Sequence, residues 1–202
     1  MGKTYKHYIF DFDYTLFDTS KGMSLCYKYA LEKIGIIYHS EMLDEYVKES
    51  LKTTYRRYKS DMREFDIFES TFLEISKNYM CDNTEIYKDT STVIKELYRR
   101  AAIISIVSGK PKSRIDEILN KYNLNSYFSR IIGYGDYKDP KPNPESIIMC
   151  IKTIGVEPAQ CVYIGDSLYD VQAAKNAGID GILLDRKGKM PDSIFSLNEL
   201  II

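Results

Sequence analysis

The chain has 202 residues, with 28 lysines and arginines against 29 aspartates and glutamates, and a formal net charge of −1. This balance excludes a strongly basic protein that holds nucleic acid by neutralising many phosphates, so we expect no nucleic-acid partner. Hydrophobic residues make up 44% and charged residues 28% of the chain, which argues against extensive disorder. The length allows one domain, or one domain that carries a smaller insertion.

Cysteine usage and apolar runs indicate the compartment. The four cysteines form no Cys-x-x-Cys pair, and two histidines are too few for a zinc site of common spacing. The longest apolar stretch, residues 101–107 with Ser105 inside it, is too short to cross a bilayer. We therefore expect a reduced, soluble, cytoplasmic protein with no membrane partner.

The first part of the chain predicts one strand and then a helical segment. Residues 8–10 form a short apolar run that leads into Asp11. Residues 19–89 contain no proline and no strand-like run, and we expect several helices of about 12 to 20 residues there. Two apolar stripes at helical spacing support this prediction: Tyr27, Leu31 and Ile34, and then Phe65, Phe68, Phe72 and Ile75.

From residue 103 onward, short apolar runs alternate with helical patterns, which is typical of a parallel α/β sheet. Strands are predicted over residues 103–107, 130–134, 161–164 and 181–184. Helices are predicted from Pro111 to Tyr122, from Pro144 towards Gly155, and over residues 168–177. The predicted fold is thus an α/β protein: a Rossmann-like parallel-sheet core from residues 1–18 and 90–202, with an inserted α-helical cap from residues 19–89.

Two aspartates follow the first predicted strand. The carboxyl ends of parallel strands form the sheet edge where ligands bind, and Asp11 and Asp13 lie there. Two carboxylates on one loop repel each other, so such a loop usually holds a cation or a proton. A turn with two solvated aspartates is the plainer alternative. A calcium loop is excluded, because Leu16 and Gly22 occupy the positions of its required glycine and glutamate.

A second acidic group follows the strand at residues 161–164. Asp166 is expected at the same sheet edge as Asp11, and Asp170 lies four residues later. Capping of the next helix would explain one of these two aspartates but not both. Three carboxylates from two strand ends make an oxygen-rich site suited to Mg²⁺.

Ser108-Gly109 and Lys141 are further candidates. The Ser108 hydroxyl and backbone N–H groups near a helix start can hold a phosphate oxygen, although a Ser-Gly pair alone is more often a plain turn. A lysine without special neighbours is usually a surface residue. Lys141 differs because it lies among three prolines, which restrict the backbone and so orient its side chain. The sequence does not decide whether the Lys141–Pro142 bond is cis or trans.

Two competing motifs are excluded. A Walker loop would need glycine at position 104, and no Gly-x-Ser-x-Gly occurs in the chain.

Taken in order, these residues resemble the four motifs of the haloacid dehalogenase superfamily: Asp11-x-Asp13-x-Thr15, Ser108, Lys141 and Gly165-Asp166-x-x-x-Asp170. The resemblance spans essentially the whole chain. It is strongest to the branch with a small helical cap, which includes phosphoglycolate phosphatase-like, pyrophosphatase-like and β-phosphoglucomutase-like members. Two positions depart from the usual pattern, since Tyr14 replaces a common glycine and Gly109 a common asparagine.

The resemblance implies a Mg²⁺-dependent phosphatase that hydrolyses a small phosphorylated metabolite. Asp11 would be the nucleophile and would form an aspartyl-phosphate. Asp13 would protonate the leaving oxygen and then activate water. An acid at position 13 also argues against dehalogenase and phosphonate-cleaving chemistry. A phosphosugar mutase and a non-catalytic phosphometabolite-binding relative stay open as alternatives.

The other motif residues would bind phosphate and metal. The resemblance implies Ser108, Gly109 and Lys141 as phosphate ligands, with Ser108 and Lys141 also counted as catalytic. It implies that Asp11, Asp166 and the main-chain carbonyl of Asp13 hold Mg²⁺. Asp170 and Thr15 would orient these residues without binding phosphate or metal directly.

Substrate recognition is expected to belong to the cap. Its most basic, aromatic stretch is residues 55–59 (Tyr-Arg-Arg-Tyr-Lys) with Arg63. We favour a solvated helix face for this stretch over contact with an anionic substrate. The expected assembly is a monomer or a weak homodimer.

Overall fold

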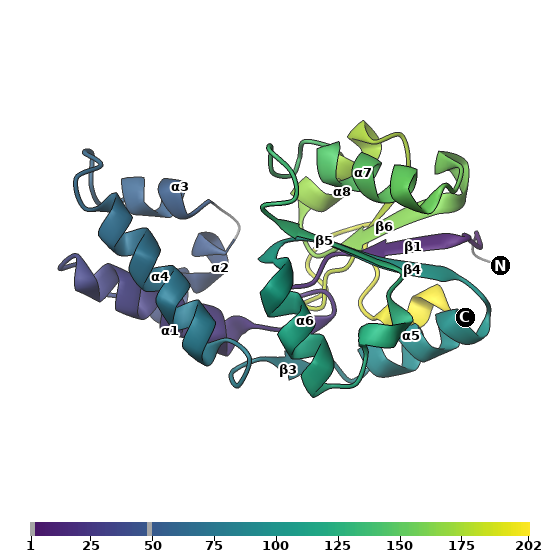
Figure 1. Cartoon of the computed structure of the whole chain (residues 1–202), viewed down its shortest axis with the longest axis horizontal. Coiled ribbons are helices and arrows are strands. Elements are labelled where there is room, and N and C mark those ends of the chain that lie inside the picture. The colour runs from purple at the N-terminus through teal and green to yellow at the C-terminus, as the bar shows by residue number, and fades with distance from the viewer. Residues whose placement is uncertain (1–2, 48–49) are drawn as a thin grey trace. The chain divides into compact units, whose positions relative to one another are not determined.

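A computed structural model of the protein describes residues 3–47 and 50–202. The chain divides into two compact units, of which the first contains the chain up to Asp18 and from Ile86 onward. The second unit is Thr19–Glu85 (Figure 1). No helix within the described ranges combines the length and the apolar character needed to span a membrane.

The first unit is built on a five-stranded parallel sheet with the strand order β5-β4-β1-β6-β7. Its strands are β1 (His7–Phe10), β4 (Ile103–Pro111), β5 (Arg130–Tyr134), β6 (Cys161–Gly165) and β7 (Asp180–Leu183). The central strand β1 pairs with β4 on one side and with β6 on the other. The carboxyl ends of these three strands therefore lie side by side, at the point where the strand order reverses and where such sheets bind ligands.

Helices cover both faces of this sheet. In Figure 1, α5 (Thr90–Arg99) and α6 (Lys112–Lys121) lie on one face, and α7 (Glu145–Ile154) and α8 (Leu168–Asn176) lie on the other. Because both faces are covered, every residue of β1 and β6 is buried. Short 3₁₀ turns at Asn125–Tyr127, Pro158–Gln160 and Leu197–Leu200 complete the unit.

The predicted parallel α/β fold is confirmed, with differences at single elements. The strand expected to end at residue 107 continues to Pro111, and its register with β5 shifts between Val107 and Pro111. The helix expected from Pro111 begins at Lys112, with Pro111 as the capping residue. Helix α5 had no sequence prediction. The helix after Pro144 ends as expected, because Gly155 adopts the left-handed conformation at φ 75°.

The second unit is helical, and its helices are uneven in length. Helices α1 (Ser20–Lys33) and α4 (Phe65–Tyr79) contain 14 and 15 residues, and their apolar stripes pack together, with the Tyr27 and Phe72 rings 5.0 Å apart. By contrast, α2 (Leu43–Tyr46) and α3 (Leu51–Arg56) contain only 4 and 6 residues and are shorter than expected. The stretch between α1 and α4 lacks a continuous apolar stripe, so packing cannot sustain longer helices there.

A small two-stranded sheet is formed by β2 (Phe17–Asp18) and β3 (Glu85–Ile86), where the chain passes from one unit to the other. The sequence predicted no strand near residue 85. A strand of two residues carries no readable alternation, so only the structure could reveal it.

Candidate active site

The candidate site lies at the carboxyl edge of the parallel sheet. Asp11 is the first residue after β1, and Asp166 is the first residue after β6. Ser108 lies within β4, and Lys141 belongs to the segment between β5 and α7. Four elements that are distant in sequence thus bring these residues to one place, because β1 has β4 and β6 as its direct neighbours.

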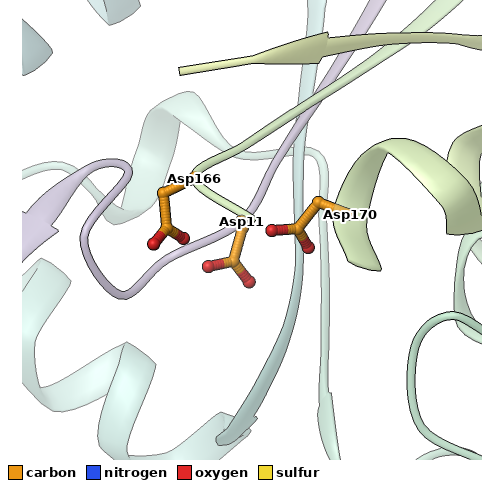
Figure 2. A group of neighbouring side chains, drawn as sticks. All are labelled: Asp11, Asp166 and Asp170. Carbon is orange, nitrogen blue, oxygen red and sulfur yellow. The ribbon is translucent and has the colours of Figure 1, made fainter. Parts of the chain in front are cut away.

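Three carboxyl groups form the centre of the site. One carboxylate oxygen from each of Asp11, Asp166 and Asp170 lies within 4.8 Å of the others. Figure 2 shows these side chains next to one another, at the end of β1, after β6 and at the start of α8. Asp11 and Asp170 are buried, and Asp166 is half-buried. Carboxylate oxygens are the ligands that small divalent cations prefer, so this donor set fits such a cation.

The acidic cluster carries more negative charge than its surroundings balance. Burial, assisted by the charges of Asp170 and Asp13, raises the pKa of Asp11 to about 7 against the opposing effect of Lys141. Burial also raises the pKa of Asp166 well above its usual value, assisted by the charges of Asp11 and Asp170. A bound cation would relieve this repulsion by favouring the ionised carboxylates.

Lys141 is held in the cluster by three acceptors. Its Nζ donates to Asp11 Oδ1 at 2.8 Å, to Asp170 Oδ1 at 2.6 Å and to the Tyr163 hydroxyl at 3.0 Å. Burial alone would lower the pKa of Lys141, but the charges of Asp11 and Asp170 outweigh it and hold the pKa well above its usual value. The ammonium therefore stays charged beside Asp11. The Lys141–Pro142 peptide bond, which the sequence left open, is cis.

Tyr163 is a site residue that the sequence analysis missed. It lies in β6, is fully buried, and donates its hydroxyl proton to the Val107 carbonyl at 2.6 Å while it accepts from Lys141. In the sequence it appears as one more apolar core residue of a buried strand. The available signal was the hydroxyl itself, which needs a partner when it is buried.

Asp170 divides its two oxygens between two tasks. Oδ2 accepts from the Ser167 N–H at 3.0 Å and from the Ser167 hydroxyl at 2.6 Å. The Asp170 N–H in turn donates to the Ser167 hydroxyl oxygen at 3.2 Å, which completes a capping box at the start of α8. Oδ1 accepts from Lys141. A Cβ at Gly165 would lie 2.4 Å from Asp170 Cγ, so only glycine admits this carboxyl group at the strand end. The cap of α8 is therefore Ser167, and Asp166 remains directed to the cluster.

Asp13 lies apart from the three clustered carboxyl groups. Its Oδ1 is 3.1 Å from Lys110 Nζ, an ion-pair distance without hydrogen-bond geometry. The turn that carries it is tight, since Tyr14 adopts φ 59° and the Leu16 N–H donates to the Phe12 carbonyl. The metal-ligand prediction for Asp13 concerned its main-chain carbonyl and stays a prediction.

The two phosphate-ligand candidates on β4 differ in burial. Ser108 is buried, and its hydroxyl accepts from the Lys110 N–H at 3.3 Å. Gly109 is exposed, and a Cβ there would meet nothing within 4 Å, so its backbone does not require glycine. Thr15 is fully buried, and its hydroxyl has no hydrogen-bond partner among the described residues. Its carbonyl accepts from Arg186 Nη2 at 2.8 Å.

The basic stretch of the helical unit is engaged with its own acidic neighbours. Tyr55 is buried in the core of that unit. Arg57 Nη1 donates to Glu45 Oε2 at 2.7 Å, and Lys59 pairs with Glu64. Arg63 pairs with Asp61 at 2.9 Å. This arrangement favours the solvated helix face over a preformed anion site.

Comparisons with known proteins agree with this arrangement. A family described as "Haloacid dehalogenase-like hydrolase" matches residues 8–184. A phosphoglycolate phosphatase of Aquifex aeolicus is 25% identical over 175 residues, covering 84% of this chain and 80% of that protein. A Caldanaerobacter subterraneus protein, provisionally named a pyrophosphatase, is 25% identical over 175 residues, covering 86% of this chain and 79% of that protein. A Bacteroides fragilis structure, provisionally named a haloacid dehalogenase-like hydrolase, is 27% identical with a TM-score of 0.91, covering 98% of this chain and all of that one.

Proposed function

The chain belongs to the haloacid dehalogenase-like hydrolase family, and we propose that it is a phosphatase that hydrolyses a small phosphorylated metabolite through a phosphorylated aspartate. The observation that carries this proposal is the pairing of the buried Asp11 carboxyl with the Lys141 ammonium at 2.8 Å, beside two further carboxyl groups. A nucleophile, a fixed positive charge and a set of oxygen donors are the parts that phosphoryl transfer needs.

In the first half-reaction, an oxygen of Asp11 attacks the phosphorus of the ester. A bond forms between Asp11 and phosphorus, and the bond from phosphorus to the leaving oxygen breaks. Asp13 gives its proton to that leaving oxygen, which departs as an alcohol. Lys141 and the Ser108 hydroxyl, with backbone N–H groups at Gly109, hold the phosphoryl oxygens and stabilise their charge.

In the second half-reaction, water attacks the phosphorus of the phosphorylated Asp11. Asp13 takes a proton from this water, the Asp11–phosphorus bond breaks, and inorganic phosphate leaves with the enzyme regenerated. Asp170 takes no part in bond making. It holds Lys141 through Oδ1, while its Oδ2 stays in the capping box of α8. Thr15 would support Asp13 through the tight turn that they share.

The family implies Mg²⁺, and the residues present fit it. Asp11 and Asp166, with the main-chain carbonyl of Asp13, would hold the ion at the acidic cluster. The raised pKa values of Asp11 and Asp166 support this assignment, because they mark a site that lacks compensating positive charge. When bound, Mg²⁺ supplies charge neutralisation for the phosphoryl group.

The named relatives support the choice of the first substrates. Proteins similar to this chain are named phosphoglycolate phosphatase and, provisionally, pyrophosphatase, so phosphoglycolate and pyrophosphate are the first substrates to test. The acid at position 13 is the feature that favours an ester with an alcohol leaving group, since a poor leaving oxygen needs a proton.

The test is phosphate release from a panel of phosphoglycolate, sugar phosphates, nucleotides and pyrophosphate, with Mg²⁺ or with EDTA, for wild type and Asp11→Asn. We expect release that requires Mg²⁺ and is lost in Asp11→Asn. A folded wild type that is no faster than Asp11→Asn on every compound would contradict hydrolysis. Accumulation of an isomeric sugar phosphate in place of free phosphate would identify a mutase.

A further inference from the structure

Lys110 is a buried lysine for which the proposed reaction has no task. Its side chain is 5% exposed, and it lies two residues beyond Ser108 on β4. Lysine is almost never buried to this extent unless its ammonium has an anionic partner. That partner is Asp13, whose Oδ1 lies 3.1 Å from the Lys110 Nζ.

The local backbone turns Lys110 towards the site. The register of β4 against β5 shifts between Val107 and Pro111, and such irregularities re-aim side chains at the end of a strand. Within this segment Gly109 is exposed and Lys110 is buried. The neighbouring strand accommodates the segment at Gly133, where a Cβ would lie 2.7 Å from the Lys110 carbonyl oxygen and 2.5 Å from the Lys112 nitrogen. Glycine at position 133 is therefore a condition for this placement.

The two lysines of the site serve different aspartates. Lys141 contacts Asp11 and Asp170, whereas Lys110 contacts Asp13. Asp13 Oδ1 is buried and accepts no hydrogen bond from the described residues, so the Lys110 charge is the contact that fixes this oxygen. A carboxyl group that is held at one oxygen keeps its second oxygen directed elsewhere, and a general acid must be directed at the leaving oxygen.

We propose that Lys110 is a positioning residue that holds Asp13 in the orientation needed for proton transfer to and from the leaving oxygen and water. This inference rests on the proposed function, because it takes Asp13 as the acid and base. It assigns Lys110 no contact with phosphate and no bond making. Replacement of Lys110 should therefore slow most strongly those reactions whose leaving oxygen needs the proton from Asp13.

The test uses Lys110→Met, which keeps the aliphatic stem, and Lys110→Arg, which restores a charge. Each is compared with wild type on the alkyl phosphate that wild type hydrolyses fastest and on p-nitrophenyl phosphate, whose phenolate leaves without protonation. Lys110→Met should lower kcat/KM by about 10- to 100-fold on the alkyl ester and by less than about 3-fold on p-nitrophenyl phosphate, because kcat/KM reports the steps up to departure of the leaving group and excludes the later attack of water, which both esters share. Lys110→Arg should recover most of the loss. Lys112→Met, at an exposed neighbouring lysine, is the matched control.

Coupling to Asp13 gives a second readout. In an Asp13→Asn background, Lys110→Met should cost almost nothing further, because the group that it positions is already absent. Equal losses of kcat/KM on both esters, a rise in KM with unchanged kcat, or full additivity with Asp13→Asn would each overturn the inference. A rise in KM alone would instead identify a phosphate ligand.

A crystal structure of Lys110→Met separates this inference from the proposed function. If wild type hydrolyses no ester on the panel, the proposed function fails, and the position of Asp13 is still measurable. We expect the Asp13 carboxyl to leave its wild-type orientation in Lys110→Met. An unchanged Asp13 side chain would overturn the positioning role whatever the activity.

Discussion

The two units of this chain treat charged side chains in opposite ways. In the α/β unit, Lys141 Nζ lies 2.8 Å from Asp11 Oδ1 and 2.6 Å from Asp170 Oδ1, and only 3% to 14% of these three side chains is exposed. In the helical unit, pairs such as Arg57–Glu45 lie at the surface, with 33% and 52% of their side chains exposed. Burying a charge costs several kcal/mol even when it is paired, whereas an exposed pair contributes about 0 to 1 kcal/mol.

Buried and exposed charges therefore differ in what they indicate about function. A fold retains buried charges at a cost to stability, so their presence at a sheet edge points to function. Exposed pairs cost almost nothing and carry no such information. The α/β unit therefore supports a specific reaction, while the charges of the helical unit do not identify a substrate.

Replacing Lys141 should have the largest effect on stability, together with a large effect on activity. Lys141→Met should lower kcat/KM by at least about 10³-fold, because the phosphoryl group loses its fixed positive charge. It should also lower the free energy of unfolding by about 3 kcal/mol, because Asp11 and Asp170 lose their buried partner. Steady-state kinetics and urea unfolding measure the two effects. Lys138→Met, at an exposed lysine of the same segment, is the matched control and should change neither.

The pair of Asp89 and Arg186 tests a buried charge outside the proposed reaction. Asp89 accepts from Arg186 Nη1 at 3.0 Å, from the Ser196 hydroxyl at 2.7 Å and from the Leu197 N–H at 2.8 Å. Burial would raise the pKa of Asp89, but these donors outweigh it and lower the pKa. Asp89→Asn should therefore lower the free energy of unfolding by about 2 kcal/mol at pH 7.

The pH dependence of this loss has a definite sign. A carboxyl group whose pKa is lower in the folded state stabilises the fold above its unfolded pKa, about 3.9, and loses that contribution as the pH falls through the folded value. The gap between wild type and Asp89→Asn should thus shrink below about pH 4. A gap that stays constant down to pH 2 would contradict the ionic role. As a control, Glu96→Gln breaks the exposed pairs with Arg99 and Arg100 and should leave Tm unchanged both at pH 7 and below pH 4.

Asp11→Asn should abolish activity and yet stabilise the protein in the absence of divalent cations. Because burial and neighbouring carboxylates raise the pKa of Asp11 to about 7, ionising it in the folded state costs stability as the pH rises from about 4 to 7. At pH 8 in EDTA, we expect a gain of about 1 to 2 kcal/mol that disappears near pH 4. Mg²⁺ should raise the Tm of wild type more than that of Asp11→Asn. A variant that is less stable than wild type at pH 8 in EDTA would contradict this account.

The smallest effect is expected in the helical unit. Arg57→Gln should change kcat/KM by less than about 3-fold, because Arg57 is already paired with Glu45 at the surface. Lys52→Gln, at an exposed lysine of α3, serves as the control. A loss of more than about tenfold for Arg57→Gln alone would contradict the solvated-face interpretation and would show that this pair opens to bind an anionic substrate.

The sequence predicted the sheet and the position of Asp11 and Asp166 because each follows a short apolar run. In a parallel α/β pattern, such a run fixes both the strand and the edge at which it ends. The lengths of α2 and α3 were not predictable in this way, since short helices depend on packing partners and not on their own periodicity.

Lys110 and Tyr163 were missed for physical reasons. The apolar run of β4 ends at Val107, so the continuation to Pro111 and its shift in register leave no trace in the hydrophobic pattern. Lys110 therefore fell between the predicted strand and the predicted helix and carried no prediction. Tyr163 lies inside an apolar strand, where its ring fits the hydrophobic pattern. The sequence does not reveal which group its hydroxyl contacts. Both contacts depend on neighbouring strands that only the fold brings together.

The central claim is that Asp11 carries the phosphoryl group during the reaction. The most direct measurement is acid quenching of wild type during turnover of its best substrate, followed by mass spectrometry of the peptide that contains Asp11. We expect a phosphoryl group on Asp11 that hydroxylamine removes. In Asp11→Asn, we expect neither this group nor phosphate release. Phosphate release by Asp11→Asn at the wild-type rate would contradict the account.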